Sequence, residues 1–315
     1  MTDRGVAVIG PGAIADAHLA AFAEIGGARP LWAIGRDPDR TSAFAARWEI
    51  SHTGTDIRQA LADPHVDVAL ICSPNALHAG QAAEALRAGK DVIVEIPMSL
   101  SAEDAQMTVD LAQECGRRVF ACHTMRSFAG IRHLHDLIAS GRESVTQVAG
   151  FFAIPRRNNE GFSGTRTWVD DLLWHHACHL VDATLWVTGR DAIEAPTLLR
   201  GDNHAQFGMT MDLTMSFVIA GDPRVIASHS LTYNASTLCW QMRFCGLRGD
   251  YVFDNGNLFG TGGEILIEGA SIRDLRFQNS QILHGLRTGA QTDFEGRDVL
   301  PSMRALRLLD KAGDR

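Results

Sequence analysis

A glycine-rich turn near the start of the chain limits the available folds more than any other feature. A short apolar run at residues 5–9 leads into GPGAIA at residues 10–15, and helical periodicity follows. In a GxGxxA turn the first glycine permits a tight bend, the second lets a pyrophosphate approach the backbone, and the alanine lets helix and strand pack closely. The turn therefore predicts dinucleotide binding, with an ordinary glycine-rich turn as the alternative. The expected phosphate contacts are Gly10, Gly12, Ala13 and Ile14.

The end of the next apolar segment indicates which dinucleotide is bound. Residues 30–34 (PLWAI) are typical of a strand, and NAD enzymes place an acid at the end of this strand to bind the ribose hydroxyls. Here Gly35 takes that position and Arg36 follows it. A guanidinium binds a 2′-phosphate, whereas an acid repels it. We therefore expect NADP, with Arg36 as the main contact and Arg40 as a second. In the alternative, Asp37 binds the ribose and the cofactor is NAD.

Strands and helices continue to alternate up to about residue 122. Apolar strand patterns cover residues 66–72, 91–95 and 118–122, with helical patterns between them. This alternation implies right-handed βαβ crossovers and a parallel sheet, which binds ligands beyond the carboxyl ends of its strands. The sequence therefore predicts a Rossmann domain over residues 1–122. Four polar residues at or after strand ends join the expected cofactor site: Ser73, Asn75, His78 and Glu95.

The remaining residues, 123–315, predict a substrate-binding α/β domain that also mediates oligomerisation. The alternating segment MTMDLTMSFVI at residues 209–219 is typical of a sheet with two unlike faces. We expect one face to carry helices and the other to contact another subunit, in a homodimer or homotetramer. The last helical pattern, residues 302–311, is expected to pack back on the first domain.

A helical stretch with three histidines, residues 166–182 (RTWVDDLLWHHACHLVD), is the strongest candidate for catalysis. At 3.6 residues per turn His175 and His179 share one face, while His176 lies about 100° around the helix from His175. A histidine on such a face suits a general base near neutral pH. The alternative is a set of hydrogen-bonded core histidines.

Three segments together resemble the glucose–fructose oxidoreductase and inositol dehydrogenase family (Gfo/Idh/MocA). They are GPGAIA at residues 10–15, ICSPNALHAGQAAEALRAGKDVIVEIP at residues 71–97, and HLVDATLW at residues 179–186. The resemblance covers nearly the whole chain. It implies an α/β fold, with a doubly wound parallel sheet followed by an α/β domain that has a large open, mostly antiparallel sheet. It also implies hydride transfer between a nicotinamide and an alcohol carbon.

Two positions that differ from the family pattern bear on the proton acceptor. The family reads Glu-Lys-Pro where residues 95–97 read Glu-Ile-Pro, and it has an aspartate at the position of His175. Because the resemblance retains His179, we expect His179, or else His175, to act as the base. Asp171 and Asp182 each lie one helical turn from one of these histidines and are candidates to orient it.

Arginines near the histidine stretch indicate the charge of the substrate. Guanidinium groups bind carboxylates in a two-pronged geometry. Within the family, residues 94–182 resemble members that oxidise the hemiacetal of a dicarboxylated semialdehyde with NADP. We therefore expect a small carboxylated substrate, with another carboxylated semialdehyde, a hydroxy acid or a sugar as alternatives. The expected substrate contacts are Arg126, Arg156, Arg166, Trp168 and His176.

Composition argues against other classes of partner. The 315 residues carry a net charge of −8, so no bulk positive field attracts nucleic acid or an anionic membrane. No apolar run is long enough to span a bilayer, and six cysteines without CxxC spacing are typical of reduced thiols in a cytoplasmic protein. His175 and His179 have the spacing of a zinc pair, but no glutamate follows the first and no third ligand is evident, so we expect no metal. A non-catalytic NADP sensor is a further alternative, because the family lysine is absent.

Overall fold

The computed structural model describes residues 3–161, 164–166, 168–269, 271 and 274–313. These residues form two units. Unit 1 comprises residues 3–123 and 274–300, and unit 2 comprises residues 124–271 and 301–313. The expected boundary after residue 122 is close to the observed one, but the chain returns to unit 1 near its end, which the sequence analysis did not foresee.

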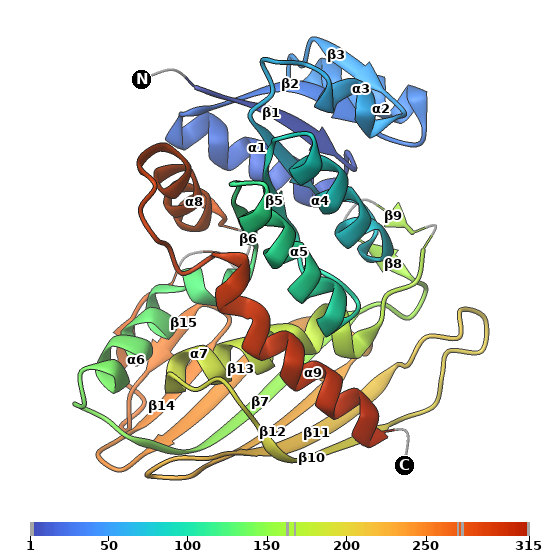
Figure 1. The fold of residues 1–315 in the computed structure, drawn as a ribbon. Coiled ribbons are helices and arrows are strands. Elements are labelled where there is room, and N and C mark those ends of the chain that lie inside the picture. The colour runs from blue at the N-terminus through green and yellow to red at the C-terminus, as the bar shows by residue number, and fades with distance from the viewer. Residues whose placement is uncertain (1–2, 162–163, 167, 270, 272–273, 314–315) are drawn as a thin grey trace. The chain divides into compact units, whose positions relative to one another are not determined.

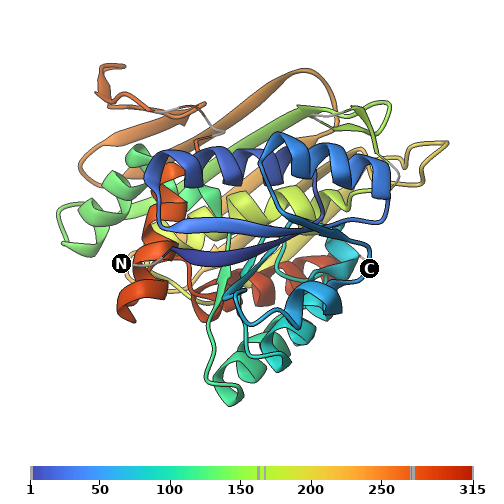
Figure 2. The same ribbon diagram turned by 90° about the horizontal axis from the view of Figure 1, so that it is seen from above.

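Unit 1 is a parallel sheet with helices on both sides, as Figure 2 shows. Its six strands follow the order β3-β2-β1-β4-β5-β6, and every pair of neighbours is parallel. This is the predicted doubly wound topology. The elements are β1 (Arg4–Ile9), α1 (Ala13–Ile25), β2 (Ala28–Ile34), α2 (Pro38–Arg47), β3 (His52–Gly54), α3 (Ile57–Leu61), β4 (Val68–Ile71), η1 (Asn75–Leu77), α4 (His78–Arg87), β5 (Asp91–Val94), α5 (Ala102–Glu114), β6 (Val119–Ala121), α8 (Arg276–Thr288) and η4 (Gly296–Val299).

Helix α8 belongs to unit 1 because its apolar face completes the core of that unit. Ile282 and Leu283 are buried against α1 and the central strands, together with Leu19 and Phe22. Burying a leucine or isoleucine side chain in this way contributes about 1.5–3 kcal/mol. The assignment of this segment to the second domain was therefore wrong.

Unit 2 is built on an eight-stranded sheet with the order β10-β11-β12-β7-β13-β14-β15-β16. Only β7 and β12 pair in parallel; the other neighbours are antiparallel, as the family resemblance implied. Its elements are η2 (Thr124–Ser127), α6 (Ala129–Ala139), β7 (Val145–Pro155), β8 (Glu160–Gly161), β9 (Gly164–Thr165), η3 (Leu172–Ala177), α7 (Cys178–Thr188), β10 (Glu194–Arg200), β11 (Asp212–Ile219), β12 (Val225–Thr232), β13 (Asn234–Gly246), β14 (Asp250–Asp254), β15 (Asn257–Phe259), β16 (Ile265–Ile267) and α9 (Leu300–Gly313).

The large sheet has the two unlike faces that its alternating sequence predicts. In β11 the apolar side chains of Leu213, Met215 and Phe217 are buried, while the residues between them are more exposed. Helices α6, α7 and α9 lie along one face of the sheet (Figure 1). On the sheet, the side chains of Phe151 and Ile226 are 41% and 54% exposed. The homodimer or homotetramer expected from an open sheet face stays a prediction.

The last helix, α9, belongs to unit 2. The expectation that residues 302–311 pack back on the first domain stays a prediction. Ser302 Oγ donates to Asp182 Oδ1 at 2.6 Å, and Trp174 Nε1 donates to Asp310 Oδ2 at 3.1 Å. The first bond connects the start of α9 to α7, and the second connects the end of α9 to η3. Among the described residues, no helix combines the length and apolar composition needed to cross a bilayer. None of the six cysteines, all of which are described, forms a disulfide.

Candidate active site

The glycine-rich turn between β1 and α1 has the geometry of a phosphate cradle. Gly10 has φ +87°, and a Cβ there would lie 2.5 Å from the backbone nitrogen of Ser73, so only glycine fits. A Cβ at Gly12 would meet nothing closer than the Gly10 carbonyl at 4.0 Å, so the protein itself leaves this space open. No side chain caps the first turn of α1. Its N–H groups, at Ala13 and Ile14 among others, can therefore donate to a pyrophosphate.

The end of β2 disfavours an acidic side chain at the ribose position. A Cβ on Gly35 would overlap the Thr41 hydroxyl and the ring of Pro11. Asp37, the alternative ribose ligand, caps α2: its Oδ1 accepts from the backbone N–H groups of Asp39 and Arg40 at 3.1 Å. Arg36 is exposed beside this cap.

His78, an expected cofactor ligand, links two backbone carbonyls, and its cofactor role stays a prediction. The side chain is 1% exposed, Nδ1 lies 2.8 Å from the Pro97 carbonyl, and Nε2 lies 2.8 Å from the Ser73 carbonyl. The ring therefore joins the turns that follow β4 and β5. Asn75 begins the short helix η1 and is buried, while Ser73 is partly exposed.

Glu95, at the end of β5, belongs to a buried polar network that the sequence did not reveal. Its Oε1 lies 2.7 Å from His18 Nε2, and His18 Nδ1 lies 3.0 Å from Asn279 Oδ1 on α8. Burial by itself would raise the pKa of Glu95. The hydrogen bonds from His18 and from the Ile96 backbone outweigh burial and lower this pKa below its usual value. The carboxylate therefore stays ionised at neutral pH.

The histidine stretch of unit 2 begins with a π-helical turn, η3, and continues as α7. Asp171 caps η3 through a 2.9 Å bond from the Trp174 backbone N–H to its Oδ1. The wider turn changes the directions of the side chains that an α-helix would give. The rings of His175 and His176 stack, with centroids 4.1 Å apart and planes 14° from parallel.

Two further rings extend this stack on either side. Trp168 lies parallel to His175 at a centroid distance of 6.0 Å, and Phe152 lies parallel to His176 at 5.2 Å. Packing on both faces restricts the histidine rings to one orientation. Trp168, an expected substrate contact, is partly exposed.

Asp170 is the residue of this cluster that the sequence analysis missed. Its side chain is fully buried, and His175 Nδ1 lies 2.9 Å from its Oδ1. Arg156 and Arg166 both pair with its Oδ2 through Nη1. Asp170 lies before η3, next to the extended cap residue Asp171, so no helical spacing relates it to His175.

The expected substrate arginines differ in their accessibility. Arg126 is buried and pairs with Asp182 through two hydrogen bonds of 2.8 and 2.7 Å. Arg156 is 3% exposed and pairs with Asp170, so both arginines are buried, and their role as substrate contacts stays a prediction. Arg166 keeps 16% of its side chain exposed and stacks over Trp168.

His176 and His179 are both buried among aromatic rings. His176 Nδ1 lies 2.7 Å from the hydroxyl of Tyr233, a neighbour that the sequence analysis did not select. Burial first, and then the charges of His175 and Arg156, lower the pKa of His176 well below its ordinary value. His179 packs against Trp240 at a centroid distance of 4.9 Å.

The carboxylates expected to orient a catalytic histidine have other partners. Asp171 caps η3, and Asp182 binds Arg126 and Ser302. Asp170 Oδ1 lies 2.9 Å from His175 Nδ1, and the orienting role expected of Asp171 or Asp182 stays a prediction.

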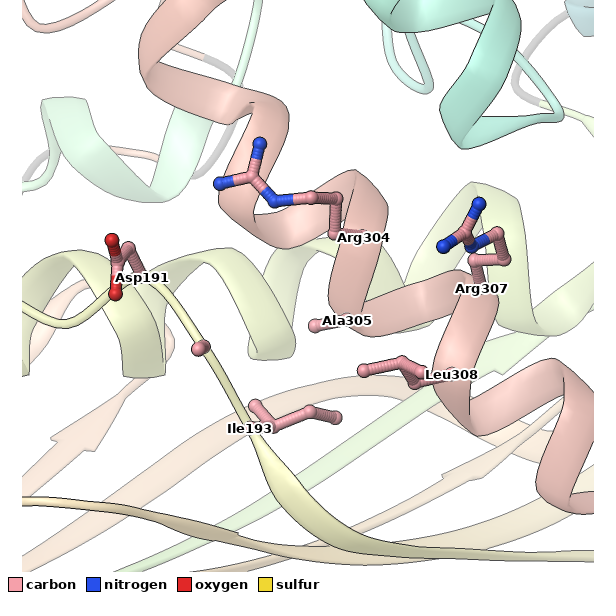
Figure 3. Close-up of a pocket in the computed structure, with 7 residues that line it drawn as sticks. Asp191, Ile193, Arg304, Ala305, Arg307 and Leu308 are labelled. Atoms are coloured by element: carbon pink, nitrogen blue, oxygen red, sulfur yellow. The ribbon is translucent and has the colours of Figure 1, made fainter.

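A hollow in unit 2 lies away from these residues. It has a volume of about 160 Å³ and lies between α9 and the segment before β10 (Figure 3). Its lining includes Ile193, Ala305 and Leu308, and none of the predicted site residues. It is therefore separate from the histidine cluster.

Comparisons with known proteins agree with the fold and the cofactor turn. Residues 4–123 match the GFO_IDH_MocA model, described as an oxidoreductase family with an NAD-binding Rossmann fold, and residues 130–271 match the C-terminal model of bacterial oxidoreductases. The 4-carboxy-2-hydroxymuconate-6-semialdehyde dehydrogenase of Sphingobium sp. (strain NBRC 103272 / SYK-6) is 30% identical over 96% of each chain.

Solved structures show the same fold at lower identity. GenD2 from gentamicin A biosynthesis, in complex with NAD, has a TM-score of 0.85 at 20% identity and covers 100% of this chain and 95% of its own. Levoglucosan dehydrogenase, in complex with NADH and levoglucosan, has a TM-score of 0.85 at 16% identity and covers 99% and 98%. The chain therefore belongs to the Gfo/Idh/MocA family and is an NAD(P)-dependent oxidoreductase.

Proposed function

We propose that the protein oxidises the cyclic hemiacetal of 4-carboxy-2-hydroxymuconate-6-semialdehyde to 2-pyrone-4,6-dicarboxylate, a step of protocatechuate 4,5-cleavage, with NADP as the oxidant. The relative that is 30% identical over nearly the full chain supports this substrate class. The histidine cluster of unit 2 is the structural observation that carries the proposal.

The reaction needs a proton acceptor near neutral pH. When the hemiacetal carbon gives up hydride, its hydroxyl gives up a proton, and a carbonyl forms. Ile96 stands where the family has a lysine, so the histidine helix supplies the acceptor, at His179 or His175. NADP, when bound, would supply the hydride acceptor for this oxidation.

Local positive charge supports a carboxylated substrate in an acidic protein. Two guanidiniums, of Arg156 and Arg166, share the single carboxylate of Asp170, which leaves one net positive charge in a mostly buried cluster. Arg157 adds an exposed guanidinium nearby, bound to the Asn234 carbonyl. This positive field stabilises a bound substrate carboxylate more than it stabilises a neutral sugar.

The features around β2 support NADP over NAD. Gly35 has no room for the acidic side chain that binds ribose hydroxyls, and Asp37 is engaged in capping α2. An exposed Arg36 offers a guanidinium to a 2′-phosphate.

The proposal is tested by following reduced cofactor formation from freshly generated semialdehyde, with NADP and NAD in parallel. The matched control substrate is 2-hydroxymuconate-6-semialdehyde, which lacks the 4-carboxyl group. We expect kcat/KM to be at least tenfold higher with NADP than with NAD, and higher for the carboxylated substrate. If the protein oxidises only another semialdehyde, a hydroxy acid or a sugar, the proposed substrate is wrong and the protein is a related dehydrogenase. Tight NADP binding without any turnover would favour a sensor.

A further inference from the structure

A series of buried hydrogen bonds connects the late helix α8 to the carboxyl edge of the parallel sheet in unit 1. Asn279 Oδ1 lies 3.0 Å from His18 Nδ1, and His18 Nε2 lies 2.7 Å from Glu95 Oε1. Asn279 and His18 are completely buried, whereas the Glu95 side chain keeps 11% of its surface exposed. The series therefore begins in the core of the unit and ends on a carboxylate that is partly accessible.

Glu95 lies on the opposite side of the glycine-rich turn from the expected ribose contact. The strand order β2-β1-β4-β5 places Arg36, after β2, on one side of this turn and Glu95, after β5, on the other. A dinucleotide bound across the carboxyl ends of such a sheet has its adenosine half on the β2 side and its nicotinamide half on the other. Neighbouring strands are about 4.8 Å apart, so Glu95 is two strands, or about 10 Å, from Gly10 along this edge.

We propose that His18 and Asn279 are positioning residues that hold the Glu95 carboxylate where it favours the cationic, oxidised nicotinamide over the neutral, reduced one. The inference goes beyond the proposed substrate, because it concerns the cofactor alone and applies to NADP and NAD equally. Asn279 belongs to α8, which joins unit 1 only after the strands of the large sheet are complete. A residue far along the chain from the glycine-rich turn thereby becomes part of the cofactor site.

Burial makes the ionised form of Glu95 depend on its hydrogen bonds. Burial alone raises the pKa of this carboxyl group, and the bond from His18 is the largest effect that lowers the pKa again. An ionised carboxylate only accepts hydrogen bonds, so Nε2 of His18 carries a hydrogen. Asn279 holds Nδ1 with an amide that can accept or donate, so the ring cannot rotate without losing a second bond. Loss of either bond should therefore leave Glu95 less ionised at neutral pH.

His18, Glu95 and Cys122 also lie close enough together to share a metal ion. One ligand atom of each is within 4.8 Å of the others. Two ligands of a tetrahedral zinc ion are about 3.4 Å apart, because each bond is about 2.0–2.2 Å long. The 2.7 Å between His18 Nε2 and Glu95 Oε1 is instead a hydrogen-bond distance. The geometry therefore favours the hydrogen bond over a shared metal ion.

Calorimetric titration of the oxidised and the reduced cofactor at one neutral pH tests the proposal without any substrate. The measured quantity is the ratio of the Kd for the reduced cofactor to the Kd for the oxidised cofactor. Glu95→Gln should lower this ratio at least about tenfold, because opposite unit charges within about 10 Å change a Kd by more than that at an effective dielectric constant of about 20. An unchanged ratio in Glu95→Gln would overturn the proposal.

His18→Leu and Asn279→Leu test the positioning roles. Each variant removes one hydrogen bond of the series, and each should lower the ratio by about three- to tenfold, because part of the Glu95 population becomes neutral. The double variant should match His18→Leu within about twofold, because Asn279 acts through His18. Gln278→Met is the matched control. This neighbouring amide of α8 is equally buried and has no hydrogen-bond partner among the described residues, so the ratio should stay within about twofold.

Two outcomes with these variants would overturn the positioning roles. One is a folded Asn279→Leu protein with the wild-type ratio, and the other is an equal fall in Gln278→Met, which would indicate a general effect of packing. If the leucine variants do not fold, nitrogen-15 NMR of the wild-type protein decides. His18 Nε2 should carry a hydrogen, with its signal identified by the shift in Glu95→Gln, and an unprotonated Nε2 would overturn the proposal.

A stoichiometric metal ion in the purified protein, lost in Cys122→Ser, would overturn the proposal as well. Oxidation of the semialdehyde enters none of these measurements, so a failure of the proposed substrate leaves the test of the cofactor site intact.

Discussion

Replacing Arg126 by methionine separates a structural role from a substrate-binding one. The guanidinium is 2% exposed and makes two bonds to Asp182, whose side chain is completely buried and also accepts from Ser302. Arg126→Met leaves the Asp182 carboxylate buried without its counter-charge. Breaking one side of a buried ion pair costs about 3–5 kcal/mol. At about 2–4 °C per kcal/mol for a unit of this size, Tm should fall by about 6–20 °C.

Differential scanning calorimetry and urea unfolding measure this loss, and steady-state kinetics below the transition measure KM. The double variant Arg126→Met/Asp182→Leu should be more stable than the single variant, because it removes the uncompensated charge. Arg200→Met is the matched control. Its pair with Asp310 is partly exposed, at 27% and 38%, so the loss should be about 1 kcal/mol or less. A folded Arg126→Met protein with unchanged Tm and a tenfold higher KM would refute the reasoning and restore Arg126 as a substrate ligand.

Three further changes test other parts of the structure. Arg36→Ala should raise KM for NADP by about 10–150-fold, the equivalent of a lost charge-assisted hydrogen bond, and leave KM for NAD unchanged, with a smaller effect from Arg40→Ala. Gly12→Ala should leave Tm unchanged, because the atom nearest to the added Cβ is the Gly10 carbonyl oxygen at 4.0 Å. The same variant should bind NADP at least tenfold more weakly in calorimetric titration, because the Cβ fills the space of the pyrophosphate. Burial lowers the pKa of His229 to about 3, so between pH 6.5 and 3 the unfolded chain binds a proton that the native chain does not, and stability falls as pH falls. From pH 7 to 5 His229 should contribute a loss of about 2 kcal/mol, which His229→Gln should remove in urea unfolding at the two pH values.

The fold of unit 1 could be predicted because its signals are local. Gly10 and Gly12 mark a turn whose requirements concern backbone dihedrals and close approach, and the apolar strands are short and continuous. The return of α8 to this unit could not be predicted in the same way. An apolar helix face does not name its partner in the sequence, and the packing of Ile282 and Leu283 against α1 became visible only in the structure.

The histidine cluster of unit 2 shows the limits of helical spacing read from a sequence. The histidine stretch was recognised, but its side-chain directions were derived from 3.6 residues per turn. The structure starts the helix at Leu172, and Asp170 precedes its extended cap residue Asp171, so the contact of Asp170 with His175 follows no helical spacing. Sequence spacing alone also could not show that Arg156 is buried with Asp170.

Analysis of the reaction product tests the central claim most directly. The protein is incubated with the semialdehyde and NADP, NADPH is counted by absorbance, and the product is identified by NMR and mass spectrometry. The account predicts one 2-pyrone-4,6-dicarboxylate for each NADPH, because the hemiacetal carbon loses hydride while the ring stays closed. An open-chain tricarboxylate in the same ratio, or no NADPH at all, would contradict it.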